Sequence, residues 1–145
     1  MQVKVKKLNE NAKLPVYGTD GAACFDIYCL DNGVVTIQPG KSENLKTGLA
    51  FEIPEGHVMM VFSRSGHGFK NGIRLSNCTG IIDSDYRGEL NVKLQNDGKE
   101  TFLISGAERV AQAMVVPFDH VEFIETEDLS ETERGTGGLG STGVK

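Results

Sequence analysis

The stretch from residue 77 to residue 94 reads NCTGIIDSDYRGELNVKL and is the most informative part of the chain for the fold. An apolar run ends at Ile82, and after a polar segment Leu90–Leu94 alternates apolar and polar side chains, as half-buried strands do. This pattern predicts two strands joined by a polar turn. On composition alone, Asp83–Glu89 is more typical of a hairpin tip than of a site. A carboxylate such as Asp83, held beside a water and a phosphate, could nevertheless act as a general base.

Strand signals recur along the whole chain and are separated by turns. Residues that tolerate positive φ or preset a turn dihedral cluster at Asn32-Gly33, Pro39-Gly40, Pro54-Glu55-Gly56, Asn71-Gly72 and Asn96-Asp97-Gly98. Runs rich in β-branched or aromatic residues, or alternating with period two, lie at Val3–Val5, Val34–Ile37, Val58–Phe62, Val115–Val116 and Val121–Ile124. We expect one helix of one or two turns after Arg64. The pattern predicts an all-β sandwich or barrel rather than βαβ units.

Composition argues against several classes of protein. The 145 residues carry a net charge of −5, whereas non-specific binding to nucleic acid or to an anionic membrane calls for a basic face. No apolar run is long enough for a transmembrane helix, and the N-terminus lacks the apolar block of a signal peptide. The three cysteines, Cys24, Cys29 and Cys78, lack metal-type spacing and are expected to be free thiols in a reducing cytoplasm.

The last 21 residues differ from the rest of the chain. Residues 125–133 are acidic and poor in apolar side chains, and residues 134–143 read RGTGGLGSTG. Neither segment can bury enough surface to offset its own ordering entropy. We therefore expect a β domain over residues 1–124, followed by a linker and a flexible arm over 125–145 that orders only on a ligand or a neighbouring subunit.

Four further stretches could carry chemistry, although each is individually more typical of a surface turn or a core strand. Ser63-Arg64-Ser65-Gly66 offers a guanidinium fork, a hydroxyl and an open amide to an anion. The Gly-rich arm has the glycine spacing of a P-loop, but Ser141 stands where that motif requires Lys, and no helix can follow. The other two stretches are Gly106–Gln112 and Gly21–Ile27, the second containing Asp26.

Taken together, the five stretches resemble the five motifs of the trimeric dUTPase family, in the family's order and over nearly the whole chain. The segment Gly80–Glu89 matches the third motif and is the most specific. The first is represented by the stretch around Asp26. The remaining matches are Arg64-Ser65-Gly66 with Lys70, Gly72 and Ile73 for the second, Gly106, Arg109, Ala111 and Gln112 for the fourth, and Arg134-Gly135, Gly137-Gly138 and Gly140–Gly143 for the fifth.

The resemblance implies a jelly-roll-like β fold, a homotrimer with active sites at subunit interfaces, and hydrolysis of dUTP to dUMP and pyrophosphate with Mg²⁺. This reaction would lower dUTP levels and supply dUMP for thymidylate synthesis. By the same resemblance, Asp83 orients the attacking water, and Tyr86 excludes a ribose 2′-hydroxyl. The backbone around Asn77, Ile81 and Ile82 reads uracil. The other implied roles are phosphate binding by Arg64, Ser65, Gly66, Gln112, Arg134, Ser141 and Thr142, closure of the arm through Gly138, Leu139 and Gly140, and orientation of metal-bound waters by Asp26.

Three departures from the family pattern bear on these roles. Leu139 stands where the family usually has a Phe that stacks on uracil, so we expect weaker closure of the arm. Ser63 replaces the usual Pro, and Cys24-Phe25 replaces the usual Gly-Leu before Asp26.

Two other functions are compatible with such a fold. The first is deamination of dCTP, which the pattern around Asp83–Tyr86 disfavours. The second is a non-enzymatic regulatory module, which the presence of Asp83, Arg64 and Arg134 disfavours without excluding a second role.

Overall fold

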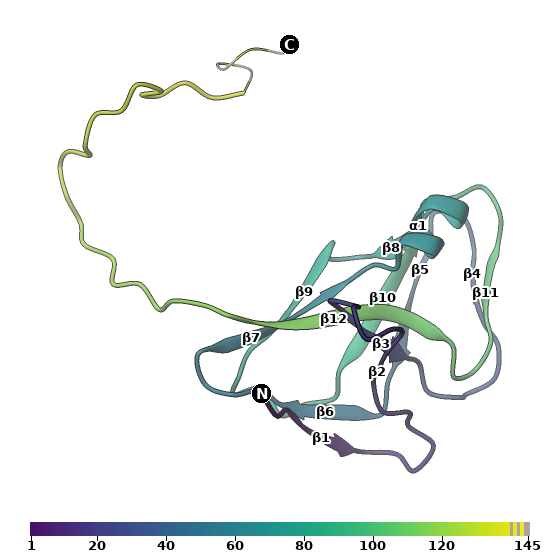
Figure 1. Cartoon of the computed structure of the whole chain (residues 1–145). Coiled ribbons are helices and arrows are strands. Elements are labelled where there is room, and N and C mark those ends of the chain that lie inside the picture. Colours follow the sequence, from purple (N-terminus) through teal and green to yellow (C-terminus); the bar gives the residue numbers. More distant parts are fainter. Residues whose placement is uncertain (140, 142, 144–145) are drawn as a thin grey trace.

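The computed structural model describes residues 1–139, 141 and 143 and is mostly β (Figure 1). The prediction of an all-β chain with one short helix is confirmed for this described part. Its elements in chain order are β1 (Lys4–Lys7), β2 (Val16–Tyr17), β3 (Phe25–Tyr28), β4 (Val35–Ile37), β5 (Ser42–Lys46), β6 (Leu49–Glu52), β7 (His57–Phe62), α1 (Ser65–Asn71), β8 (Ile73–Leu75), β9 (Thr79–Ile82), β10 (Asn91–Asn96), β11 (Phe102–Ile104) and β12 (Arg109–Pro117).

The strands form open sheets in which every pairing is antiparallel. The largest sheet has the order β2-β3-β12-β7-β9, and a second has the order β5-β10-β8. Two further pairs, β1-β6 and β11-β4, complete the body. Among the two architectures predicted, packed sheets are therefore observed rather than a closed barrel. One apolar core joins all of them, with Ile27, Leu94, Leu49 and Ile104 each at most 1% exposed.

The helix α1 lies where the sequence predicted it, between Arg64 and Asn71-Gly72. It ends because Gly72 adopts a left-handed φ of 68°, and a Cβ at this position would collide with the backbone of Gly98. None of its residues is fully buried, so α1 caps an end of the body rather than filling the core. This seven-residue helix is also far too short to cross a bilayer, and it is the longest helix of the described chain.

The predicted strand at Val121–Ile124 is not formed. The last strand, β12, ends at Pro117, and a strand needs a neighbour to satisfy its backbone groups. Within the described residues this segment has none, and Val121, Phe123 and Ile124 are 64%, 93% and 80% exposed. The predicted domain boundary at residue 124 stays a prediction.

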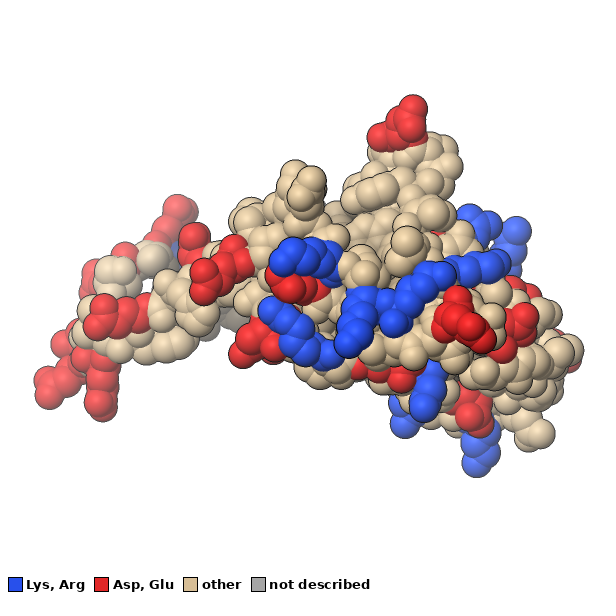
Figure 2. Space-filling view, turned by 90° about the horizontal axis from the view of Figure 1, so that it is seen from below, with Lys and Arg blue, Asp and Glu red and all other residues tan. Residues whose placement is uncertain are grey.

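Charge is distributed unevenly between the body and its C-terminal extension. The Phe118 amide still donates to the Gly56 carbonyl at 3.1 Å, and beyond it the chain runs clear of the body in a long arc (Figure 1). Acidic side chains crowd this extension, whereas Lys and Arg form a band across the underside of the body (Figure 2). Lys4, Lys6 and Arg87 line one groove on the body. The body therefore has a basic surface region, although the net charge of the whole chain is −5.

Candidate active site

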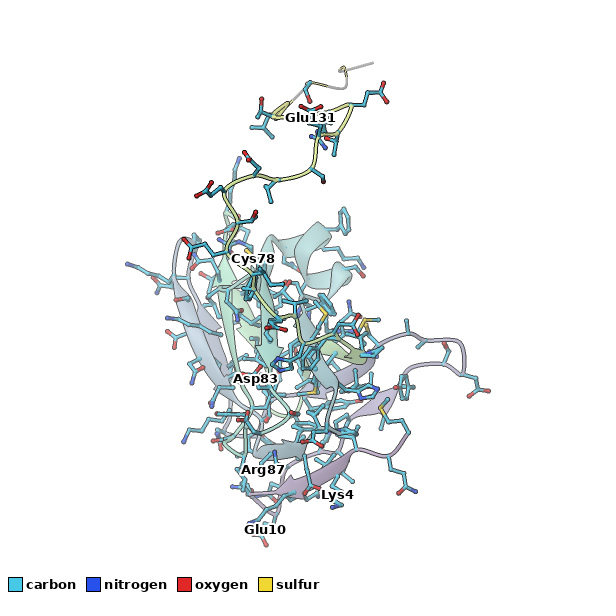
Figure 3. The ribbon with its side chains drawn as sticks, turned by 90° about the vertical axis from the view of Figure 1, so that its left-hand side faces the viewer. Lys4, Glu10, Cys78, Asp83, Arg87 and Glu131 are labelled. Atoms are coloured by element: carbon cyan, nitrogen blue, oxygen red, sulfur yellow. The ribbon has the colours of Figure 1, made fainter. Side chains whose placement is uncertain are left out.

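The two strands predicted from the opening stretch are formed as β9 and β10, but they do not pair into a hairpin, because β9 pairs with β7, and β10 pairs with β5 and β8. The segment between them, residues 83–90, is a loop that connects two sheets, and we call it the β9–β10 loop. Its tip is closed by a hydrogen bond from the Tyr86 amide to the Asp83 carbonyl, at 3.2 Å, and Arg87 Nη1 donates to the Ser84 carbonyl at 2.6 Å. The Asp83 side chain lies on the surface, between Cys78 and Arg87 in the view of Figure 3. The local hydrogen bonds thus use backbone acceptors and leave the Asp83 carboxylate open to a ligand.

The ring of Tyr86 is held against the backbone of the same β9–β10 loop. Its hydroxyl donates to the Glu89 carbonyl at 3.1 Å. A Cβ at Gly88 would collide with the Tyr86 hydroxyl and ring carbons, so this packing requires glycine there. The ring is 44% exposed and therefore offers a flat, oriented surface to a ligand.

The β9–β10 loop is fixed to the body at its end, just before β10. Glu89 Oε1 accepts from the Gly48 amide at 2.8 Å, and the Leu90 amide donates to the Leu49 carbonyl at 2.8 Å. The buried Thr47 hydroxyl donates to the Leu90 carbonyl at 2.7 Å. Asp83 and Tyr86 therefore project from an anchored support rather than from a free loop.

Two adjoining pockets open along β9 and the β9–β10 loop. The larger, about 400 Å³, is lined in part by Asn77, Gly80 and Ile81. The smaller, about 240 Å³, is lined in part by Asp83 and Tyr86. The two share the lining residues Ile81, Ile82, Leu90 and Asn91. The structure thus brings together five of the predicted site residues: Asn77, Ile81, Ile82, Asp83 and Tyr86.

A second group of predicted residues meets at the opposite end of β7. Gln112 of β12 is in register with Asp26 of β3 on one side and with Phe62 of β7 on the other. The Gln112 amide Nε2 donates to the Ser63 carbonyl at 3.1 Å. Arg64 Nε lies 3.6 Å from Asp26 Oδ1, and Arg64 Nη1 donates to the Arg109 carbonyl at 3.1 Å. Arg64, Gln112 and Asp26 therefore form one cluster.

The amides that follow Arg64 add to this cluster. Ser65 and Gly66 open α1 and are exposed, and the helical backbone bonds begin only with the Gly68 amide, which donates to the Arg64 carbonyl at 3.0 Å. The amides of Ser65 and Gly66 therefore have no acceptor within the helix. Together with the guanidinium they supply donors suited to a phosphate.

Asp26 differs from its expected local structure. Taken alone, its stretch was interpreted as a loop or cap, but Asp26 lies within β3, and its side chain is 14% exposed. Arg109 Nη1 holds the other carboxylate oxygen, Oδ2, at 3.2 Å. Two cations therefore fix this carboxylate at the edge of the cluster.

Two members of the cluster were not identified as site residues from sequence. Arg109 was part of a matched motif but had no assigned role, and His67 was not singled out at all. The ring nitrogen Nε2 of His67 lies 3.2 Å from Arg64 Nη1. Arg64 and His67 are three residues apart at the start of α1, and this spacing, which places two side chains on one side of a helix, is the sequence signal that could have revealed the contact.

Asp83 and Arg64, one from each cluster, lie at opposite ends of β7, although Asn77 of the first cluster lies near the Phe62 end. Strand β9 runs antiparallel to β7, so Ile82 pairs with Met59 and Thr79 pairs with Phe62. Asp83 therefore follows the Met59 end, whereas Arg64 follows the Phe62 end in extended conformation. Five residue steps at about 3.3 Å each separate Met59, the partner of Ile82, from Arg64, so Ile82 and Arg64 lie about 16 Å apart along the strand.

The described part of the arm contacts neither cluster. Arg134 Nε donates to the Gly137 carbonyl at 3.0 Å, and the Ser141 amide donates to the Gly138 carbonyl at 3.2 Å. Leu139 is fully exposed. Glu131 lies well away from Asp83 in Figure 3. The predicted residues Gly140 and Thr142 lie outside the described residues.

The donor set fits a magnesium ion that arrives with a polyphosphate. In the described chain no three His, Cys, Asp or Glu side chains gather as a metal cage. Mg²⁺ usually keeps several waters and binds through one or two carboxylates plus substrate phosphates. The Asp26 carboxylate, fixed beside the cations of the phosphate-type cluster, suits contact with such an ion through water.

Comparison with known proteins agrees with this geometry. The family model for dUTPase matches residues 10–143. A deoxyuridine 5′-triphosphate nucleotidohydrolase of Nautilia profundicola is 50% identical over 143 residues, 99% of each chain. One of a Hydrogenobaculum species is 45% identical over the full length of both chains.

The solved structures most like this chain include dUTPases of bacteriophages. That of Staphylococcus bacteriophage 80alpha with dUPNHPP is 30% identical, covers 99% of each chain and has a TM-score of 0.90. A variant of the dUTPase from phage phi11 of S. aureus, described with a structural Mg(II) ion, is 25% identical over 90% of this chain and the whole of that one, with a TM-score of 0.81. The chain belongs to the dUTPase family.

Proposed function

We propose that this chain hydrolyses dUTP to dUMP and pyrophosphate in the cytoplasm, removing dUTP and supplying dUMP for thymidylate synthesis. The observation that carries the proposal is the anchored β9–β10 loop, which holds an open carboxylate, Asp83, and an oriented aromatic ring, Tyr86, beside adjoining pockets. Membership of the dUTPase family gives the reaction. The roles of individual residues follow from their chemistry.

Asp83 acts as the general base. A water beside its carboxylate attacks the α-phosphorus, and Asp83 takes the proton as the new P–O bond forms. The bond between the α-phosphorus and the oxygen bridging to the β-phosphate breaks, and pyrophosphate leaves. Asp83 also contacts the 3′-hydroxyl of the sugar, which fixes the α-phosphate relative to the attacking water.

Strand β9 and the β9–β10 loop select the nucleoside. Tyr86 packs under the deoxyribose, and its fixed ring leaves no room for a 2′-hydroxyl. The backbone around Asn77, Ile81 and Ile82 reads the edge of uracil. The close approach of this part of the chain to the base excludes a 5-methyl group.

The second cluster holds the phosphates. Arg64, Ser65, Gly66 and Gln112 bind the α- and β-phosphates, and their positive charge stabilises the charge that develops on the phosphoryl oxygens. Asp26 orients water around the magnesium ion, which neutralises phosphate charge when bound.

An active site assembled from several subunits reconciles these roles with the fold. Asp83 and Arg64 both act near the α-phosphate in this proposal, yet Ile82, which precedes Asp83, is about 16 Å from Arg64 along β7 in one chain. A homotrimer that places the β9–β10 loop of one subunit against the phosphate cluster of another removes this conflict.

The arm closes the site from outside the body. Arg134, Ser141 and Thr142 bind the γ-phosphate, with Gly138, Leu139 and Gly140 lying over the base. The acidic linker before Arg134 spaces the arm away from its own body.

Release of pyrophosphate from dUTP, but not from UTP, dTTP or dCTP, tests the proposal. Asp83→Asn should abolish the release while the fold and trimer remain intact, and an unchanged rate would refute the mechanism. Incubation with dCTP tests the rival deaminase, because only that activity yields ammonia.

A further inference from the structure

His67 lies against the phosphate cluster in a setting built for one interaction. Its ring is half-buried and packs edge-on against Phe102 of β11, with centroids 5.2 Å apart and an interplanar angle of 65°. Its Nε2 lies 3.2 Å from Arg64 Nη1. The ring is thus clamped on one side by an aromatic residue and presents one nitrogen to the guanidinium.

The contact determines the protonation state of the ring. A guanidinium can only donate hydrogen bonds, so Nε2 must accept and the ring proton must reside on Nδ1. Nδ1 is buried and has no hydrogen-bond partner among the described residues.

The surroundings favour this neutral form. Burial lowers the pKa of His67 below its usual value near 6.5, and the charges of Arg64 and Arg109 lower it further. Glu108, at the turn before β12, is the facing group that acts in the opposite direction.

The hydrogen bonds of Arg64 show what this contact achieves. Nη1 directs one N–H to His67 and the other to the Arg109 carbonyl, while Nε faces Asp26. These acceptors come from α1, β12 and β3. Within the described chain, no hydrogen bond engages Nη2, which therefore remains for a ligand.

We propose that His67 is a positioning residue: by accepting a hydrogen bond from Arg64 Nη1, it orients the guanidinium so that Nη2 binds the phosphates of the substrate. This rests on the proposed function, in which Arg64 is a phosphate ligand. Protonation of His67 places an N–H against an N–H, so the contact breaks and Arg64 loses its fixed orientation. Binding of dUTP should therefore weaken as His67 becomes charged at low pH.

Steady-state kinetics of three variants of the full chain test this role. His67→Leu keeps an apolar side chain but has no acceptor, and we expect KM for dUTP to rise about tenfold, with a smaller change in kcat. His67→Gln retains an acceptor that does not titrate and should recover most of the loss. Phe69→Ala, at a 95% exposed position of the same helix, is the matched control and should behave as wild type.

The pH profile separates positioning from packing. From about pH 5 to 8, KM of the wild type should rise on the acid side, whereas KM of His67→Gln should rise less over the same range. Circular dichroism and trimer mass establish that each variant is folded. A wild-type KM for folded His67→Leu across this range, or equal losses in His67→Leu and His67→Gln, would overturn the proposal.

Nitrogen NMR of the ligand-free protein provides a readout that does not depend on activity. We expect His67 to be the Nδ1-protonated tautomer at neutral pH, and Arg64→Gln to change its nitrogen shifts. An Nε2-protonated ring would refute the contact even if dUTP is hydrolysed. Failure of the wild type to release pyrophosphate would instead refute the proposed function itself, with the NMR result unaffected.

Discussion

Asp83 and Arg64 of one chain lie at opposite ends of β7. Asp83 follows Ile82, which pairs with Met59, and Arg64 comes two residues after Phe62, which pairs with Thr79. The roles proposed for these residues bring both to the α-phosphate, so we expect them to come from different subunits. The two residues therefore define a test of site assembly.

Mixed trimers of Asp83→Asn and Arg64→Gln chains should regain activity although each homotrimer is inactive. If the base comes from one subunit and the phosphate ligand from the next, every mixed trimer contains one site of three with both residues intact. Coexpression with two different tags and double purification isolates these trimers. We expect about one third of the wild-type kcat per trimer. Purified mixed trimers without activity would show that the two residues act within one chain.

The all-β fold and its strands were predictable from sequence because their signals are local, whereas the expected hairpin between β9 and β10 is not formed, because strand pairing depends on tertiary structure. Alternation at Leu90–Leu94 and glycine at Gly72 report the period of a strand and the end of a helix, and both expectations are confirmed. The strand at Val121–Ile124 was predicted wrongly for this chain because a strand requires a partner that only tertiary structure supplies. The contact of His67 with Arg64 has an i, i+3 spacing that is common on helices, and only the side-chain geometry shows that the two nitrogens meet.

Gly88→Ala should reduce discrimination between deoxyribose and ribose. A methyl group at residue 88 would collide with the Tyr86 hydroxyl and ring, so the partly exposed ring must shift from its present position. We expect the ratio of kcat/KM for dUTP to that for UTP to fall by about tenfold or more.

Gly21→Ala provides the control for that comparison. A Cβ at residue 21 would meet no atom within 4 Å, and its φ lies outside the left-handed region. The ratio for this variant should equal that of the wild type. An unchanged ratio in a folded Gly88→Ala protein would mean that Tyr86 does not set sugar selectivity.

Removal of metal should lower activity without lowering stability. The described residues contain no group of three metal-binding side chains, so the ion is expected to arrive with the triphosphate. EDTA should therefore reduce kcat/KM for dUTP and leave Tm unchanged, and added Mg²⁺ should restore the rate. A Tm that falls with EDTA would point to a structural ion instead.

The same titration with Mg²⁺ tests the role of Asp26. Asp26→Asn should raise the Mg²⁺ concentration needed for half-maximal activity, because the carboxylate that orients metal-bound water is lost. Asp20→Asn, in the exposed turn before β3, should leave the requirement unchanged. Equal requirements in both variants would remove Asp26 from the metal site.

Leu139→Phe should strengthen closure of the arm. Leu139 is fully exposed in the free chain and stands at the position where the resemblance to the family implies a Phe. An aromatic stack on a base contributes about 1–3 kcal/mol, so affinity for a non-hydrolysable dUTP analogue should rise by about fivefold or more. Trypsin cleavage after Arg134 reports closure directly, and the analogue should protect Leu139→Phe at lower concentration than the wild type. Leu129→Phe, in the exposed linker, introduces the same ring outside the arm and should leave both measurements unchanged. Equal affinity and equal protection in Leu139→Phe and the wild type would show that residue 139 does not contact the base.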